Sequence, residues 1–183
     1  QLKQFRPAIE SALHKGDYDY RLFRAYLATL DALDERKNPD RVNEAFALPL
    51  LRNADTPDNL RAHVLRYLPG GHKALTSAQL ITWLNSKEKA LQQEALWKLR
   101  HFADDATAMT MRTIALNERR DPPLRLAAVA AMGLGETPDT GALLKIATGR
   151  NASLREESLR SLIGVTLEAD DQERLTELAS QHA

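Results

Sequence analysis

One apolar pattern recurs four times along this chain, and no other feature constrains the fold as strongly. Its copies begin at Leu60-Arg61, Leu91-Gln92, Leu124-Arg125 and Leu154-Arg155, so they start 31, 33 and 30 residues apart. Apolar or small residues follow each start at the same offsets. A second apolar ladder, beginning at Leu80, Met111, Leu144 and Leu175, keeps nearly the same spacing. Two ladders in step with this period predict stacked copies of a two-helix hairpin.

Prolines preceded by capping side chains mark where helices should begin. Such pairs occur at Asn38-Pro39, Thr56-Pro57, Asp121-Pro122 and Thr137-Pro138. Between these marks the apolar residues recur at intervals of three and four, which is the helical period. The pattern predicts no strand, and it predicts helices over residues 2–15, 19–34, 39–53, 57–68, 76–85, 88–102, 105–118, 122–134, 138–148, 152–165 and 170–181.

Glycines and acidic pairs predict where individual helices end, where they touch and where they begin. Glycines at positions 16, 70–71, 135 and 149 are placed where helices should stop, whereas Gly133 and Gly164 are expected to permit close helix contact. The acidic pairs are expected in the first turns of helices, where the helix dipole favours negative charge. They are Asp104-Asp105, Glu156-Glu157 and Asp170-Asp171.

Composition agrees with helices and excludes several kinds of chemistry. Hydrophobic residues make up 43% of the 183 residues but aromatics only 5%, which suits closely packed helices better than a sheet. Lys+Arg and Asp+Glu both number 25, which argues against a general binder of nucleic acid or membrane surfaces. The absence of cysteine excludes disulfides, thiolate metal sites and cysteine nucleophiles within this segment. Because the chain begins Gln1-Leu2-Lys3, we expect it to be a piece of a longer protein.

The best-conforming copy carries a family likeness. The run from Asp121 to Gly135, followed by Thr137-Pro-Asp-Thr and Ala142-Leu-Leu, resembles a HEAT-like repeat of the short variety also found in phycobilisome lyases. The likeness covers about residues 56–181 and implies an all-α, right-handed solenoid of about five to six helical hairpins. Residues 1–55, where Arg24 departs from the template, are expected to be degenerate N-terminal capping repeats, and residues 56–183 regular HEAT-like repeats of one continuous solenoid.

A second likeness concerns a parent protein. The stretch from His72-Lys-Ala-Leu-Thr to Leu154-Arg-Glu-Glu-Ser-Leu-Arg-Ser-Leu is similar to helical segments of planctomycete and verrucomicrobial exported proteins that join a dehydrogenase-like propeller to a c-type cytochrome. This resemblance implies a periplasmic or exported spacer between redox domains. The segment would bear no redox chemistry itself, and we expect it to need no cofactor.

Arginine occupies the second template position in most copies. In HEAT-like repeats this arginine usually bonds to carboxylates and loop carbonyls of the adjacent unit, which implies a structural ladder. An anion-binding stripe is the alternative, because a guanidinium presents a planar fork to phosphate. Carboxylates equal in number to the cations favour the ladder. Its members are Arg21, Arg61, Arg125 and Arg155, with Gln92 as the exception.

Trp97 lies opposite the predicted core face of its helix. Its template equivalents are Arg66, Ala130 and Arg160, and in the HEAT-like arrangement this row would line the concave surface. Tryptophan and arginine are enriched at binding hot spots, so the row is a candidate for contacting a protein partner or a flanking domain. The alternative is that Trp97 packs under residues 69–76 or against a neighbouring domain. The candidate interaction residues are Arg66, Gln93, Trp97, Glu156 and Arg160.

No catalytic or metal-binding residue is assigned. The five histidines show no ligand spacing, and no nucleophile, phosphate-binding or zinc motif occurs. The expected function is therefore a non-catalytic scaffold, spacer or protein-interaction module, without nucleic-acid or membrane partners. An alternative from another class is a HEAT-like enzyme such as an alkylpurine DNA glycosylase. It would require a basic groove and salt-dependent DNA binding, and the neutral charge speaks against it.

Overall fold

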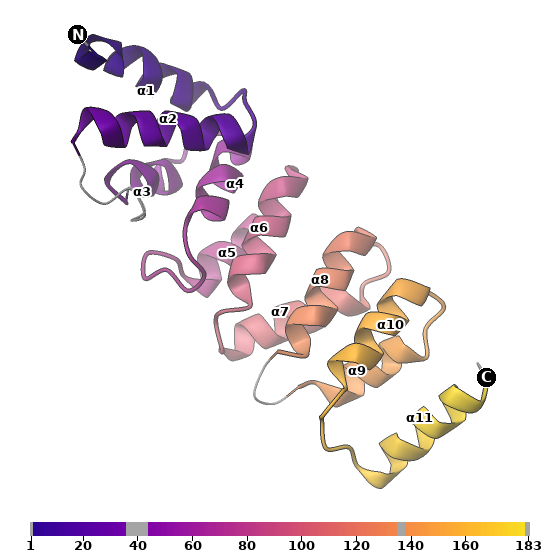
Figure 1. The fold of residues 1–183 in the computed structure, drawn as a ribbon. Coiled ribbons are helices and arrows are strands. Elements are labelled where there is room, and N and C mark those ends of the chain that lie inside the picture. The colour runs from indigo at the N-terminus through magenta and orange to yellow at the C-terminus, as the bar shows by residue number, and fades with distance from the viewer. Residues whose placement is uncertain (1, 36–43, 135–137, 182–183) are drawn as a thin grey trace. The chain divides into compact units, whose positions relative to one another are not determined.

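The described part of the chain is entirely helical. A computed structural model describes residues 2–35, 44–134 and 138–181 (Figure 1). Within these ranges the backbone forms a short 3-10 helix and eleven α-helices, and no strand. The predicted all-α class is confirmed for this part of the chain.

Each predicted helix corresponds to an observed one. The ends are mostly shorter by one to four residues, and the first predicted helix is divided into a 3-10 turn and α1. The elements are η1 Leu2–Phe5, α1 Arg6–Lys15, α2 Tyr20–Leu33, α3 Glu44–Arg52, α4 Asp58–Tyr67, α5 Ser77–Trp83, α6 Lys89–Leu99, α7 Asp105–Leu116, α8 Pro122–Met132, α9 Thr140–Ala147, α10 Ala152–Ser161 and α11 Ala169–Gln181.

Helix starts follow the capping chemistry only in part. Asp19, Thr76, Asp104, Asp139 and Asn151 each accept a hydrogen bond from a backbone N–H of the first turn. The expectation for Thr56 is wrong, because α4 begins one residue later than predicted, with Pro57 at the N-cap position and no side-chain cap. Asp121 is the N-cap residue of α8 with Pro122 after it, as predicted, but its side chain makes no cap bond to the first turn. The expected starts at Asn38-Pro39 and Thr137 lie outside the described residues, as does Gly135.

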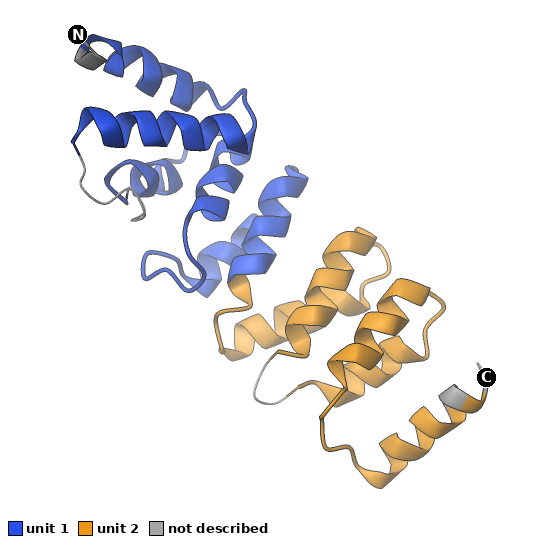
Figure 2. Ribbon diagram, viewed as in Figure 1, with its two compact units in different colours: residues 1–98 blue, residues 99–183 orange. Residues whose placement is uncertain are grey.

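The chain divides into two compact units, residues 1–98 and 99–183 (Figure 2). In unit 1, α1 packs on α2, α3 packs on α4, and α2 packs on α4. Gly16 ends α1 in the left-handed conformation at φ 68°, and its carbonyl accepts a hydrogen bond from the Asn59 side-chain amide. We predicted degenerate capping repeats up to residue 55 and regular repeats after it. The division into two units does not test this boundary, which stays a prediction.

In unit 2, the first helices of two successive hairpins, α7 and α9, lie against each other, and so do the second helices, α8 and α10. Helix α7 packs on α8 and α9, and α10 packs on α9 and α8. The buried Ser158 hydroxyl of α10 donates to the Leu143 carbonyl of α9. Helix α11 differs, because none of its side chains with an assigned exposure is buried.

The two glycines expected at helix contacts behave differently. A Cβ on Gly133 would lie 2.5 Å from the Cβ of Ser161, so the prediction of a close contact is confirmed there. The prediction is wrong for Gly164. Nothing lies within 4 Å of the position where its Cβ would be, and its φ of 81° shows that the glycine serves a left-handed turn.

The second template position ties α4, α6, α8 and α10 to the loop before each helix or, in α8, to the last turn of the preceding helix. Arg61 donates to the Asn53 and Ala54 carbonyls at 2.9 and 2.8 Å. Gln92, Arg125 and Arg155 donate to the carbonyls of Ser86, Ala115 and Gly149, respectively. The described acceptors therefore lie in the same hairpin, whereas the resemblance implied acceptors in the adjacent one.

A carboxylate extends this bonding to the next hairpin at one place. Asp58 accepts from Arg61 at 2.6 Å through one oxygen and from the Ser86 hydroxyl through the other. Arg21 is exposed and has no hydrogen bond or ion pair among the described residues. The arginine at this position is therefore structural in α4, and Arg21 does not share that role.

Candidate interaction site

Three helices of unit 1 bring charged and aromatic side chains together beside Trp97. Burial of Leu60, Val64 and Leu65 turns Arg66 of α4 away from the core. In α6, burial of Leu91, Ala95 and Leu96 has the same effect on Trp97. The cluster, hereafter the Arg66 cluster, consists of Tyr20, His63, Arg66, Glu94, Trp97 and Lys98.

Arg66 is held between two partners. Its guanidinium carbon lies 4.5 Å from the ring centroid of Tyr20, within the range of a cation–π interaction. On another side its Nε lies 4.0 Å from a carboxylate oxygen of Glu94. The Arg66 side chain nevertheless remains 59% exposed. It is therefore positioned by the protein and still open to solvent.

Within the cluster, Tyr20 is held by ring contacts with Phe23 and His63. The rings of Tyr20, Phe23 and His63 have centroids 5.7–6.1 Å apart. His63 is also hydrogen-bonded through Nε2 to the Tyr18 carbonyl at 2.9 Å. Burial raises the pKa of Tyr20, against the opposing effect of Arg24 and Arg66, so its hydroxyl stays neutral near physiological pH.

Glu94 is the carboxylate of the cluster, and it is largely covered. Its side chain is 23% exposed. Burial raises its pKa above the ordinary value, while the charges of Arg66, Lys98 and His63 act in the opposite direction. Because the pKa is raised despite three cationic or potentially cationic neighbours, the desolvation of this carboxylate outweighs their attraction.

Lys98 joins α6 to the end of α4. The residue is only 5% exposed, and its ammonium donates to the Leu68 carbonyl at 2.5 Å. Leu68 has left the helical conformation, with φ −70° and ψ 145°, so its carbonyl is directed away from the helix ladder. A buried ammonium needs such an acceptor, which makes Lys98 a link between successive hairpins.

Trp97 lies one turn beyond Glu94 on the same side of α6. It is 52% exposed, and Gln93 next to it is exposed as well. About half of the indole therefore faces solvent, while the rest is covered. Arg66, Gln93 and Trp97 of the predicted row are all exposed in unit 1, and their joint role as an interaction surface stays a prediction.

The other two predicted interaction residues lie in unit 2. Arg160 of α10 pairs with Glu156 at 3.0 Å and with Glu157 at 2.5 Å. The expectation that Glu156 and Glu157 belong to a first turn is wrong, because α10 begins at Ala152. Their charge instead pairs with Arg160 three and four residues later. By contrast, Asp170 and Asp171 lie in the first turn of α11, as predicted.

Glu94 and Lys98 were missed by sequence reasoning. A signal existed for Glu94, because it follows His63 by 31 residues, as Trp97 follows Arg66. Two template positions that are three residues apart, one turn along the helix, are therefore polar or aromatic in the same two hairpins. No local pattern indicated Lys98, whose acceptor depends on the extended conformation of Leu68.

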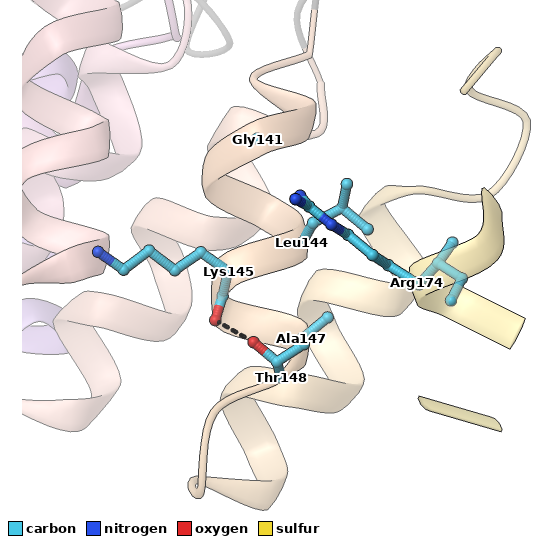
Figure 3. Close-up of a pocket in the computed structure, with 7 residues that line it drawn as sticks. Gly141, Leu144, Lys145, Ala147, Thr148 and Arg174 are labelled. Carbon is cyan, nitrogen blue, oxygen red and sulfur yellow. Dashed lines mark hydrogen bonds between the residues drawn. The ribbon is translucent and has the colours of Figure 1, made fainter. Parts of the chain in front are cut away.

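A cavity of about 400 Å³ lies between α9 and α11 in unit 2 (Figure 3). Leu144, Ala147 and Leu175 supply its apolar lining. Arg174 reaches across from α11 and is 3.7 Å from Asp171, whereas the ammonium of Lys145 points away from it. The cavity is therefore a gap beside the loosely packed last helix, without an acid–base pair among its lining residues.

Within residues 2–35, 44–134 and 138–181, no group of three or more His, Asp or Glu side chains is arranged to hold a metal ion. None of the described helices has the length and apolar character needed to cross a membrane. Comparisons of the chain with protein-family models, curated proteins and solved structures give no match. The functional proposal therefore depends on the Arg66 cluster.

Proposed function

We propose that this chain is a HEAT-like, right-handed solenoid of about five to six hairpins that serves as a non-catalytic protein-interaction module or spacer. The support is the repeated template together with the packing of like helices on like helices within each unit. Its partner would be another protein or a flanking domain of the same polypeptide. The resemblance to exported propeller–cytochrome proteins supports the second possibility.

The observation that carries the proposal is the composition of the Arg66 cluster. An exposed arginine and a half-exposed tryptophan accompany a largely covered carboxylate and an aromatic group in which Phe23 is buried and Tyr20 and His63 are half-buried. Fixed aromatic and arginine side chains lose little conformational entropy on binding, and they are enriched where binding energy is concentrated. A rigid stack of hairpins would hold them in a constant geometry.

Photo-crosslinking in the source organism tests this proposal. A photoreactive amino acid at Gln93, which is exposed beside Trp97, should crosslink to a specific protein or to a flanking domain. The same residue at Thr113, an exposed position of α7, is the matched control. Crosslinks that are absent at residue 93, or equally abundant at residue 113, would contradict an interaction role for this face.

A further inference from the structure

The terminal nitrogens of Arg66 remain available for a ligand. The ring of Tyr20 covers one side of the guanidinium, and Nε is directed to Glu94 at 4.0 Å. Within the described residues, neither terminal nitrogen makes a hydrogen bond or ion pair. The two together form a planar fork that matches the two oxygens of a carboxylate. Because Arg66 is already positioned, little entropy is lost when it binds.

An apolar surface lies one turn along α6 from Glu94, the carboxylate that faces Arg66 Nε. Trp97 follows Glu94 by three residues on α6 and is 52% exposed. A tryptophan ring offers a wide contact area for a proline or an aromatic side chain. A ligand that combines a carboxylate with such a side chain would engage both parts of the surface.

The charges around the cluster favour an anionic partner. The charges of Arg24, Arg66 and Lys98 lower the pKa of Tyr20 or of Glu94, so these cations lie close to the cluster. Glu94 is the carboxylate that accompanies them. The net charge of these four side chains is therefore positive but small. A nucleic acid would need several phosphate contacts, and this small positive excess does not supply them. A single carboxylate of a protein side chain fits better.

We propose that the Arg66 cluster binds a peptide segment that presents a glutamate or aspartate carboxylate to Arg66 and an adjacent proline or aromatic side chain to Trp97. This inference rests on the proposed interaction function and specifies the chemistry of its partner. Arg66 and Trp97 are the contact residues, and Tyr20 and Glu94 are positioning residues.

Nuclear magnetic resonance of the full chain with defined peptides tests the inference. The probe is the capped peptide Gly-Phe-Glu-Glu-Pro-Gly, and its neutral analogue carries glutamine in place of both glutamates. The acidic peptide should shift the Arg66 Nε–H and Trp97 indole N–H resonances, and the neutral analogue should bind at least about tenfold more weakly. Arg66→Gln should weaken binding of the acidic peptide about tenfold.

Two further variants separate fork geometry from charge. Arg66→Lys keeps the charge without the planar fork and should recover only part of the affinity. Arg119→Gln removes an exposed arginine from the loop between α7 and α8 and should leave binding unchanged.

The inference is overturned if neither peptide binds, if both bind equally, or if Arg66→Gln binds as well as the wild type. It is also overturned if a short oligothymidylate binds more tightly than the acidic peptide in an Arg66-dependent manner. A specific crosslink from residue 93 combined with any of these results would leave the interaction function standing. It would remove only the carboxylate specificity.

Discussion

Gly133, the C-cap residue of α8, lies against Ser161 in α10 at a distance that leaves no room for a side chain. A Cβ on Gly133 would be 2.5 Å from the Ser161 Cβ and 2.7 Å from its hydroxyl oxygen. The φ of Gly133 is −80°, which any residue adopts. The glycine is therefore required by the close approach of two helices from successive hairpins.

Gly133→Ala should destabilise the protein by about 1–3 kcal/mol, because the added methyl overpacks the contact. Urea unfolding followed by circular dichroism measures the change. Gly141→Ala is the matched control, since the nearest atom to its added Cβ would be 4.0 Å away, and it should be neutral or slightly stabilising. Equal effects of the two variants would contradict the packing of α8 on α10.

Trp97 and Leu96 are neighbours on α6 with opposite environments. Leu96 is 1% exposed and Trp97 is 52% exposed. Leu96→Ala should lower the free energy of unfolding by about 2–5 kcal/mol, whereas Trp97→Ala should cost less than about 1 kcal/mol. If Trp97→Ala costs as much as Leu96→Ala, then the tryptophan belongs to the core and does not form a binding surface.

Arg61 and Arg21 share a template position but differ in their contacts. Arg61→Ala removes bonds to the Asn53 and Ala54 carbonyls and to Asp58, and should cost about 1–2 kcal/mol of stability. Arg21→Ala should change stability by less than about 0.5 kcal/mol, as is usual for exposed positions. Thermal and urea unfolding compare the two. A larger loss for Arg21→Ala would refute this division of roles.

Glu94 should make stability depend on pH in a defined direction. Its pKa is raised in the folded state, so folding binds a proton above the ordinary value of 4.5. The resulting stabilisation is fully present below 4.5 and is lost as the pH rises through the raised pKa. Glu94→Gln should therefore flatten the stability profile in this window. Arg66→Gln should move the loss to higher pH, because Arg66 opposes the rise of the pKa.

Unfolding curves at a series of pH values provide this measurement. The difference between wild type and Glu94→Gln isolates the contribution of the single carboxylate. A difference that stays constant across the window would mean that Glu94 titrates alike in the folded and unfolded states, contrary to its covered position.

Helices could be predicted from this sequence because their determinants are local. Apolar spacing located α8 and α10, and Asp104 capped α7 where a first turn was expected. The expected cap at Thr56 failed because a proline-led start can shift by one residue without disturbing the apolar face. Gly133 was recognised as a contact glycine, whereas Gly164, one template position further along its own repeat, serves a turn.

The candidate site was only partly predictable. Template alignment indicated Arg66 and Trp97, since both positions point away from the core. It did not indicate that Tyr20 would lie under Arg66, because that contact joins α2 to α4 across 46 residues of sequence. Nor could it place the buried ammonium of Lys98, whose partner is a main-chain carbonyl. Contacts between elements depend on loop conformations that no local pattern specifies.

We propose that the whole chain forms one solenoid of stacked hairpins, and distances between spin labels on successive hairpins would reveal this arrangement. The sequence has no cysteine, so nitroxide labels can be attached at cysteines introduced in place of Arg66, Ala130 and Arg160. Successive hairpins packed at about 10 Å predict about 20 Å between labels at 66 and 130, and about 30 Å between 66 and 160. A 66–160 distance no longer than the 66–130 distance would show a bundle with a shared interior and contradict the account.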